Sequence, residues 1–268
     1  MKVLVLSDLH MGSKASRAAA HVDDIARVAA GFDRVILNGD TLDRCYTTPI
    51  TDERSLTFIS DIQRTCASRN GPPELLTGNH DPVISKTHWT YDDESATLIF
   101  HGDCILDCTH PTKKSDQQLM AKLRERWNEL GGRPVDFKTL HENYRAVQRL
   151  HMPSINPYKK PKTAFQYATS LIYPPRRPFD IIDYWMKAPG RALAVAKGFD
   201  KPVKHVVVGH THRSGHWRID GIDVYNTGSY MPFSNAFAIC IEGGRVQHVK
   251  LDSLIATSRK VVAVENVS

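Results

Sequence analysis

The stretch Lys2-Val3-Leu4-Val5-Leu6-Ser7-Asp8-Leu9-His10 decides how this chain folds. It begins as a continuous apolar run, which is typical of a parallel strand that is buried on both faces of a sheet. It ends in Asp8 and His10, a carboxylate and an imidazole. Open α/β sheets bind ligands at the carboxyl ends of their strands, and both side chains are types that bind divalent metal ions. We therefore expect this strand end to contribute to a metal site.

Length and composition indicate a soluble protein with a large core. The 268 residues are 41% hydrophobic and 24% charged, which allows one large α/β domain or one domain with an insertion. No apolar run approaches the ~20 residues that a membrane span needs, and the N-terminus does not resemble a secretory signal. The 5 cysteines are an odd number, which favours free thiols over a disulfide framework. We expect a cytoplasmic location.

The net charge of +6 is unevenly distributed along the chain. Residues 111–200 contain 17 Lys and Arg against 8 Asp and Glu, a balance of +9, so the rest of the chain sums to −3. A basic segment beside a remainder rich in carboxylates favours an anionic substrate or surface as the partner.

Four further apolar runs end in the same way as the first one. Residues 34–37 precede Asp40 and Asp43, residues 74–76 precede Asn79, His80 and Asp81, residues 96–100 precede His101, and residues 205–208 precede His210 and His212. A predicted helix over residues 15–30, with Ser13 as its N-cap, makes the first two strands a parallel crossover. In one parallel sheet all five strand ends lie along one edge, so we expect these side chains to gather there.

The gathered side chains suit a pair of divalent ions. Two ions about 3.5–4 Å apart share a bridging carboxylate, can turn a bridging water into hydroxide, and stabilise the charge of an in-line phosphoryl displacement. Gly39, Gly78 and Gly209 let the backbone turn sharply near such ions, and His80 is placed for proton transfer to the leaving oxygen. We expect manganese, with iron, zinc or cobalt as alternatives. The candidate ligands are Asp8, His10, Asp40, Asn79, His101, His210 and His212.

These motifs, in this order, resemble the five motifs of the calcineurin-like binuclear metallophosphoesterases. The motifs are Asp8-x-His10, Gly39-Asp40-x-x-Asp43, Gly78-Asn79-His80-Asp81, His101-Gly102 and Gly209-His210-Thr211-His212. The resemblance covers about residues 1–110 and 202–251. It implies an α/β fold, namely a four-layer α-β-β-α sandwich with the metals at the edge of the sheets, and a hydrolase that acts on phosphoric esters.

The resemblance also implies a role for each residue of the motifs. One ion would be held by Asp8, His10 and His212, the other by Asn79, His101 and His210, and Asp40 would bridge them. His80 would be the catalytic proton donor or a phosphate contact, with Asp43 and Asp81 as supporting groups.

Two features are similar to the UDP-diacylglucosamine pyrophosphohydrolases within this family. They are His101-Gly102-Asp103 followed by a run that contains cysteine, and Gly209-His210-Thr211-His212-Arg213 after a long helical insertion. Those enzymes use such an insertion as a lid over an acylated sugar. They carry Arg where this chain has His80, whose motif is that of the wider family, which includes nucleases, phosphodiesterases and phosphoprotein phosphatases.

The basic residues 111–201 are expected to form a helical cap on a core made of residues 1–110 and 202–268. Basic side chains interleaved with aromatic ones can bind a nucleotide, a nucleic acid or an anionic headgroup. A solvated cap whose aromatics pack on the core is the alternative. The candidate substrate-binding residues are Arg145, Lys159, Lys160 and Arg213.

Within this cap, helices are expected over residues 119–130 and 139–150, and a helix pair over 179–198. The apolar run 181–186 predicts cap core, with an acyl-chain pocket or a dimer contact as alternatives. After the cap, four short strands are expected in the C-terminal part of the chain, over residues 215–220, 222–226, 236–241 and 246–251.

The combined prediction is a phosphoesterase with two metal ions that hydrolyses a phosphodiester or pyrophosphate bond. Metal-bridging hydroxide would attack directly, without a covalent enzyme intermediate, and a nucleotide-sugar lipid is one candidate substrate. The alternatives are a nuclease that uses the basic cap, a phosphomonoesterase or phosphoprotein phosphatase of the same fold, and a scaffold without activity, in which seven ligands would serve no purpose. Peripheral membrane contact and the oligomeric state stay open.

Overall fold

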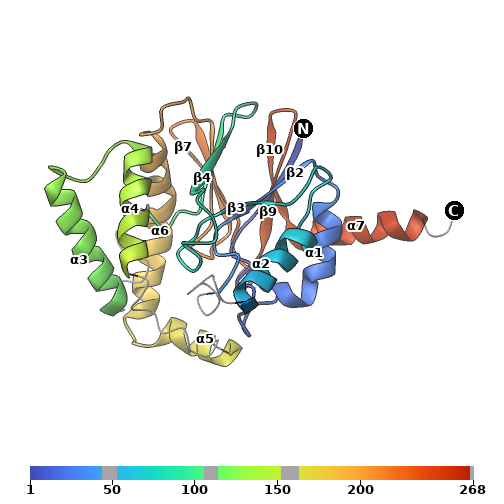
Figure 1. Cartoon of the computed structure of the whole chain (residues 1–268), viewed down its shortest axis with the longest axis horizontal. Helices are drawn as coiled ribbons and strands as arrows, with labels where there is room; N and C mark the ends of the chain where they lie inside the picture. The colour runs from blue at the N-terminus through green and yellow to red at the C-terminus, as the bar shows by residue number, and fades with distance from the viewer. Residues whose placement is uncertain (44–52, 106–113, 152–162, 266–268) are drawn as a thin grey trace.

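Two five-stranded mixed sheets lie face to face in this chain and are enclosed by helices (Figure 1). The computed structural model describes residues 1–43, 53–105, 114–151 and 163–265, and the elements named here belong to these ranges. Sheet A has the strand order β10-β9-β1-β2-β3, and sheet B has the order β4-β5-β6-β8-β7. The strands are β1 (Lys2–Leu6), β2 (Arg34–Asn38), β3 (Glu74–Leu76), β4 (Trp89–Asp92), β5 (Thr97–Phe100), β6 (His205–Val208), β7 (Gly215–Ile219), β8 (Ile222–Asn226), β9 (Phe237–Glu242) and β10 (Arg245–Lys250).

Helices cover the outer face of each sheet, which gives the four-layer α-β-β-α sandwich that the resemblance implied (Figure 1). Helices α1, α2 and α7 lie beside sheet A, and α3, α4 and α6 lie beside sheet B. No described helix is both long enough and apolar enough to cross a membrane. The helices are α1 (Val22–Ala29), which follows a 3₁₀ turn (Ala18–His21), α2 (Glu53–Thr65), α3 (Lys114–Glu129), α4 (Phe137–His151), α5 (Ala164–Ile172), α6 (Arg177–Ala196) and α7 (Leu251–Glu265).

Strand β1 explains why the first apolar run has no polar position. Leu4 and Leu6 belong to the core between sheet A and its helices, whereas Val3 and Val5 belong to the core between the two sheets. Because successive side chains of a strand point to opposite faces, a strand covered on both faces must be apolar throughout. The run therefore predicted burial correctly.

The strands that carry the motifs are divided between the two sheets. β1, β2 and β3 run parallel in sheet A, and β5 runs parallel to β6 in sheet B. The expectation of one parallel sheet is therefore wrong. The ends of β2 and β5 still meet, because the Asn38 side-chain amide donates a hydrogen bond to the Phe100 carbonyl (3.0 Å).

The helices of the basic segment supply the outer layer over sheet B. Phe137 and Tyr144 of α4 and Leu193 of α6 are buried in one cluster with Phe100 and Val206 of the sheet. The division of the chain at residues 111 and 201 stays a prediction about domains, but these helices share their core with the strands.

Several predicted elements have different bounds in the structure. The helix expected over 15–30 is an α-helix only from Val22 to Ala29, and Ser13 is not its N-cap, because its hydroxyl instead accepts from the Ala15 amide. Such local bonds of serine compete with the helix. The pair expected over 179–198 is the single helix α6, the last strand stops at Lys250, and α7 follows directly. The elements β4, α5 and α7 were not predicted from the sequence.

Candidate metal centre

The ends of β1, β2 and β6 bring together a first group of donor atoms. Asp8, His10, Asp40 and His212 each offer an atom within 4.8 Å of the others. His10 Nε2 lies 3.0 Å from His212 Nε2 and 3.9 Å from Asp8 Oδ1, and His212 Nε2 lies 3.3 Å from Asp8 Oδ1. All but His212 are buried. These atoms come from strands of both sheets, so the site forms only when the sandwich is complete.

A second group of donor atoms shares Asp40 with the first. Asp40, His101 and His210 again lie within 4.8 Å of one another. Asn79 joins them, because its Oδ1 lies 3.2 Å from His101 Nε2 and 2.6 Å from His210 Nδ1. Asp40 Oδ1 lies 3.3 Å from His101 Nε2, whereas Asp40 Oδ2 lies 3.9 Å from His10 Nε2. Each oxygen of one carboxylate therefore faces a different group.

The backbone is strained at five of the seven candidate ligands. These are Asp8 (φ 53°), His10 (47°), Asp40 (49°), His210 (67°) and His212 (59°). Residues with a side chain rarely adopt such left-handed conformations, and each costs on the order of 1–3 kcal/mol. Strain that is concentrated in one group of polar side chains indicates a functional site rather than a stabilising one.

Glycines allow the strand ends to approach one another. A Cβ atom at Gly39, whose φ is 76°, would lie 2.6 Å from the His101 ring, and one at Gly78 would collide with the Asp40 carboxylate. Any larger residue would displace a candidate ligand. This agrees with the expectation that these glycines let the backbone turn close to the metals.

Neighbouring groups orient the ligand atoms. The Asn38 carbonyl can only accept, so His101 Nδ1 donates to it (2.9 Å), and His101 Nε2 faces Asp40. Both Asp8 oxygens accept from the backbone N–H of His210 (3.1 and 3.0 Å). Such outer contacts fix the ring tautomer and the aim of a metal ligand.

Asp81 holds the loop that carries Asp40. Its Oδ1 accepts from the amides of Asp40 (3.0 Å) and Gly78 (2.8 Å), and its Oδ2 accepts from those of Thr41 (2.7 Å) and Leu42 (3.1 Å). Burial, together with the Asp40 charge, raises the pKa of Asp81 to about 7. Its carboxylate contacts only the loops around the site, so we propose for it the supporting role that the resemblance implied.

The charges in the site favour a cation. Burial opposes the ionisation of Asp40, yet the nearby histidines His101 and His80 hold its pKa well below the usual value. Burial opposes the protonation of His101, but Asp40 and Asp8 raise its pKa to about 10. Burial and the His101 charge lower the pKa of His210 to about 4. Metal binding needs ionised carboxylates and neutral imidazoles, so His210 is already in the required state, whereas His101 would give up its proton to a bound ion.

His80 and Asp43 form a pair at the edge of the cluster. His80 Nδ1 lies 2.9 Å from Asp43 Oδ1, and the His80 ring centroid lies 4.7 Å from that of His10. The backbone N–H of His80 donates to Asp40 Oδ1 (2.7 Å). The His80 side chain is 23% exposed, so it sits where a substrate can reach it.

Arg145 lies between the loops that carry the candidate ligands. Its guanidinium is buried and forms a two-pronged pair with Asp103, with Nη1 2.7 Å from Oδ2 and Nη2 2.8 Å from Oδ1. It also donates to the carbonyls of Thr77 (2.9 Å) and Gly78 (3.2 Å). Arg145 of α4 thus ties together the two loops that carry Asn79 and His101, and its contact with substrate stays a prediction.

The other predicted substrate-binding residues have different outcomes. Arg213 is exposed directly after His212, with its guanidinium 5.8 Å from the Trp185 ring centroid. Its contact with substrate stays a prediction. Lys159 and Lys160 lie outside the described residues.

Three residues that were not predicted from the sequence support the loops of the candidate ligands. Trp185 Nε1 of α6 donates to the Thr211 carbonyl (2.8 Å), and Asn226 Nδ2 at the end of β8 donates to the Gly209 carbonyl (2.7 Å). Tyr230 donates its amide to the Asp8 carbonyl (3.3 Å). A polar residue at the end of an apolar strand was the available signal for Asn226. Tyr230 and Trp185 left no such signal.

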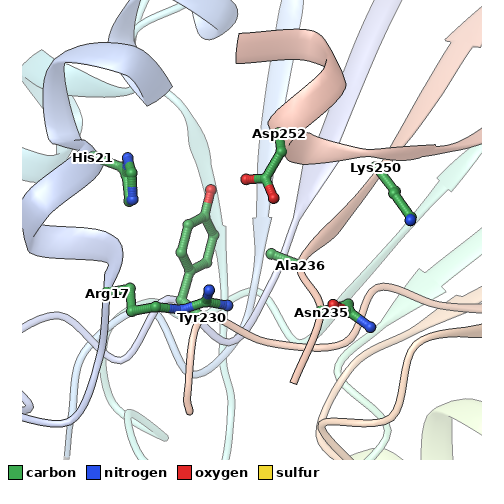
Figure 2. A pocket seen from close by; sticks show the side chains of 7 residues that line it. All are labelled: Arg17, His21, Tyr230, Asn235, Ala236, Lys250 and Asp252. Carbon is green, nitrogen blue, oxygen red and sulfur yellow. The ribbon is translucent and has the colours of Figure 1, made fainter. Parts of the chain in front are cut away.

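The ring of Tyr230 stands in a pocket behind the Asp8 loop. Figure 2 shows its hydroxyl pointing between His21 and Asp252, and Arg17 and Lys250 also line this pocket. The Arg17 amide donates to the Tyr230 carbonyl (3.1 Å). The pocket therefore shares Tyr230 with the loops of the metal site.

The donor set fits a pair of divalent ions. His210 Nε2 is buried and has no hydrogen-bond partner among the described residues. Unpaired buried polar atoms are rare and call for an explanation. Two groups of oxygen and nitrogen donors that share one carboxylate are the arrangement that two-metal sites require.

Comparison with known proteins shows the family of this chain. The profile of the calcineurin-like phosphoesterase family matches residues 1–214, whereas no curated protein sequence matches the chain. A solved dimetal phosphatase from Danio rerio is 10% identical, with 94% of this chain and 96% of that chain covered and a TM-score of 0.45. The phosphoesterase Yfce from E. coli is 11% identical, with 95% of each chain covered and a TM-score of 0.43. On the family match, the chain belongs to the calcineurin-like phosphoesterases, a family of metal-dependent hydrolases of phosphoric esters.

Proposed function

We propose that this chain hydrolyses a phosphodiester or pyrophosphate bond at a centre of two divalent ions. The observation that carries the proposal is the shared Asp40, whose two oxygens face two separate groups of donors. In this proposal Asp8, His10 and His212 hold one ion, Asn79, His101 and His210 hold the other, and Asp40 bridges them. Two such ions supply an activated water and stabilise the charge that develops on the phosphoryl group.

We propose that His80 carries the proton to the leaving oxygen. The Asp43 carboxylate accepts from Nδ1 of His80, so the transferable proton is the one on Nε2. Asp43 keeps the ring in this tautomer and stabilises the imidazolium. General acid catalysis of this kind contributes typically about 10²–10⁴-fold to the rate.

We propose a nucleotide-linked phosphoester, including a nucleotide-sugar lipid, as the first substrate class. Two observations support it. Segment 111–200 has a charge balance of +9 in the sequence, and its described residues Arg145 and Trp185 contact the loops of the site. Exposed Arg213 lies next to His212. Manganese is the first metal to test, since a set of Asp, Asn and His donors admits it.

The test is a turnover screen with protein loaded with manganese. It compares a phosphodiester, a phosphomonoester, a UDP-sugar lipid and single-stranded DNA, with Asp40→Asn as the inactive variant. Asp93→Asn is the matched control, because Asp93 is an exposed carboxylate that pairs with Lys201 (2.8 Å) away from the site. We expect the diester or the pyrophosphate to be turned over by wild type and by the control. Turnover that survives Asp40→Asn would reject the assignment.

Isotope labelling tests whether water attacks the phosphorus directly or a covalent enzyme intermediate forms first. We propose direct attack by water, so one oxygen from labelled water enters the phosphate in a single turnover, with inversion at phosphorus. Retention would mean two displacements and a covalent enzyme intermediate, which contradicts the proposal.

A further inference from the structure

Six large apolar side chains between residues 165 and 186 of segment 111–201 are exposed. They come from α5, from the turn after it and from the first half of α6, and we call them the α5–α6 surface. Single apolar residues on a surface are normal, whereas a group of them indicates an interaction site. They are Phe165 (77% exposed), Ile172 (65%), Tyr173 (73%), Phe179 (72%), Ile182 (48%) and Met186 (65%).

Helix α6 has one face toward the metal site and another toward solvent. Phe179, Ile182 and Met186 recur at i, i+3 and i+7, so they lie on one face of the helix. Trp185, by contrast, donates to the Thr211 carbonyl (2.8 Å), and the Tyr184 ring centroid lies 6.0 Å from that of His210. The apolar run 181–186, for which we expected cap core, is therefore only partly covered.

Helix α5 contributes further exposed apolar surface and carries no charged side chain. None of its nine residues, Ala164–Ile172, is ionisable at neutral pH. A capping box fixes its start, because the Thr163 hydroxyl accepts from the Gln166 amide (3.2 Å) and the Gln166 side chain accepts from the Thr163 amide (3.1 Å). It lies at the lower edge of the molecule, beside α6 (Figure 1). Helices that lie in a membrane interface combine such an apolar face with basic neighbours.

The charges around this surface favour an anionic partner. Among residues 163–191, four are basic and two are acidic, and both acidic residues are in ion pairs on α6. The first is Asp180, whose Oδ1 lies 3.3 Å from Arg176 Nε, and the second is Asp183, whose Oδ2 lies 2.6 Å from Lys187 Nζ. The α5–α6 surface is therefore apolar, and the charged residues around it carry a net positive charge.

This combination fits a phospholipid bilayer better than a nucleic acid. Nucleic acids are held by aromatic stacking and cations, but Ile172, Ile182 and Met186 have no ring to stack. Insertion of aliphatic side chains among acyl chains is favourable because it buries apolar surface, and basic residues are attracted to anionic headgroups. We propose that the α5–α6 surface docks this protein onto an anionic phospholipid bilayer, with the opposite face of α6 toward the metal site.

Flotation with vesicles tests this proposal on the whole chain and needs no catalytic activity. We expect the protein to float with vesicles of phosphatidylcholine and phosphatidylglycerol, more weakly with phosphatidylcholine alone, and more weakly at high salt. Phe179→Ser should lower the partition coefficient on the order of tenfold, the worth of one inserted aromatic side chain, and Phe165→Ser/Phe179→Ser should lower it further. Both side chains are exposed, so the circular dichroism spectrum should not change.

The matched control is Val135→Ser, which removes an apolar side chain that is 85% exposed. Val135 lies before α4, where the Phe137 amide donates to the Gly198 carbonyl (3.0 Å) beyond the far end of α6. This control should float like wild type. Three results would overturn the proposal: no flotation with anionic vesicles, flotation that Phe165→Ser/Phe179→Ser leaves unchanged, or a dimer in light scattering that Phe179→Ser dissociates. Binding of single-stranded DNA without binding of vesicles would do the same.

Discussion

Replacing Arg145 by methionine tests how the metal-binding loops are held in place. In the structure this buried guanidinium donates to both oxygens of Asp103, to the carbonyls of Thr77 and Gly78, and to Gln148 Oε1 (2.6 Å). Arg145→Met keeps much of the aliphatic volume but leaves the Asp103 charge buried without its cation. Removing one partner of a buried pair costs about 3–5 kcal/mol, so we expect a loss of unfolding free energy in this range.

The double variant Arg145→Met/Asp103→Leu shows how much of the loss of unfolding free energy comes from the unpaired Asp103 charge and how much from the lost hydrogen bonds of Arg145. Because it leaves no unpaired charge, it should regain most of the stability. The loss in the single variant should also shrink at acid pH, since Asp103 is ionised in wild type through the low pKa that Arg145 gives it, against the opposing effect of burial. Without Arg145 that carboxyl takes up a proton as the pH falls, and the penalty for its charge disappears.

Urea unfolding followed by circular dichroism measures the unfolding free energy of both variants, and elemental analysis measures how much metal each variant holds. Lys138→Met is the matched control, because Lys138 pairs with Asp200 at 2.6 Å on the surface, and such pairs are worth ~0–1 kcal/mol. We expect Arg145→Met, but not the control, to hold less metal, because the loops of Asn79 and His101 lose their common anchor. A loss below ~1 kcal/mol with full metal content would refute this reasoning.

Further predictions concern the site and the core. Asp40→Asn or His210→Ala should abolish turnover and lower the metal content while the circular dichroism spectrum is kept; normal metal content and rates in either would reject the site. His80→Ala should lower kcat by about 10²–10⁴-fold with both ions retained, and Asp43→Asn should have a smaller effect; a full kcat in His80→Ala would remove its role. Burial lowers the pKa of His141 to about 3, so the unfolded chain binds its proton first and wild type loses stability as the pH falls from 6.5 toward 3. His141→Gln should flatten this slope by up to ~1.4 kcal/mol per pH unit, as urea unfolding across this pH range would show, and an unchanged slope would contradict it.

The side chains that the sequence named as candidate ligands lie together in the structure, and each one follows a buried strand. The run before Asp8 is apolar at every position, since β1 is covered on both faces. Burial on both faces also explains why the arrangement of the sheets could not be predicted, because a fully apolar strand does not show which strand it pairs with. The resemblance supplied the two-sheet sandwich, and the strand ends alone suggested one sheet.

The contacts that hold the site could not be predicted from local pattern. Arg145 looked like any cation on an amphipathic helix, yet packing of α4 on sheet B buries it against Asp103, 42 residues away in the chain. Trp185 likewise supports Thr211 from a helix that the sequence placed in a separate cap. Such roles depend on long-range packing, which neither periodicity nor composition encodes.

Anomalous diffraction from crystals soaked in manganese is the sharpest test of the shared two-metal centre. We expect two peaks per chain about 3.5–4 Å apart, one beside Asp8, His10 and His212 and the other beside Asn79, His101 and His210. Asp40 should lie between them, and the peaks should vanish in Asp40→Asn. A single peak, or two peaks away from these side chains, would contradict the shared two-metal centre.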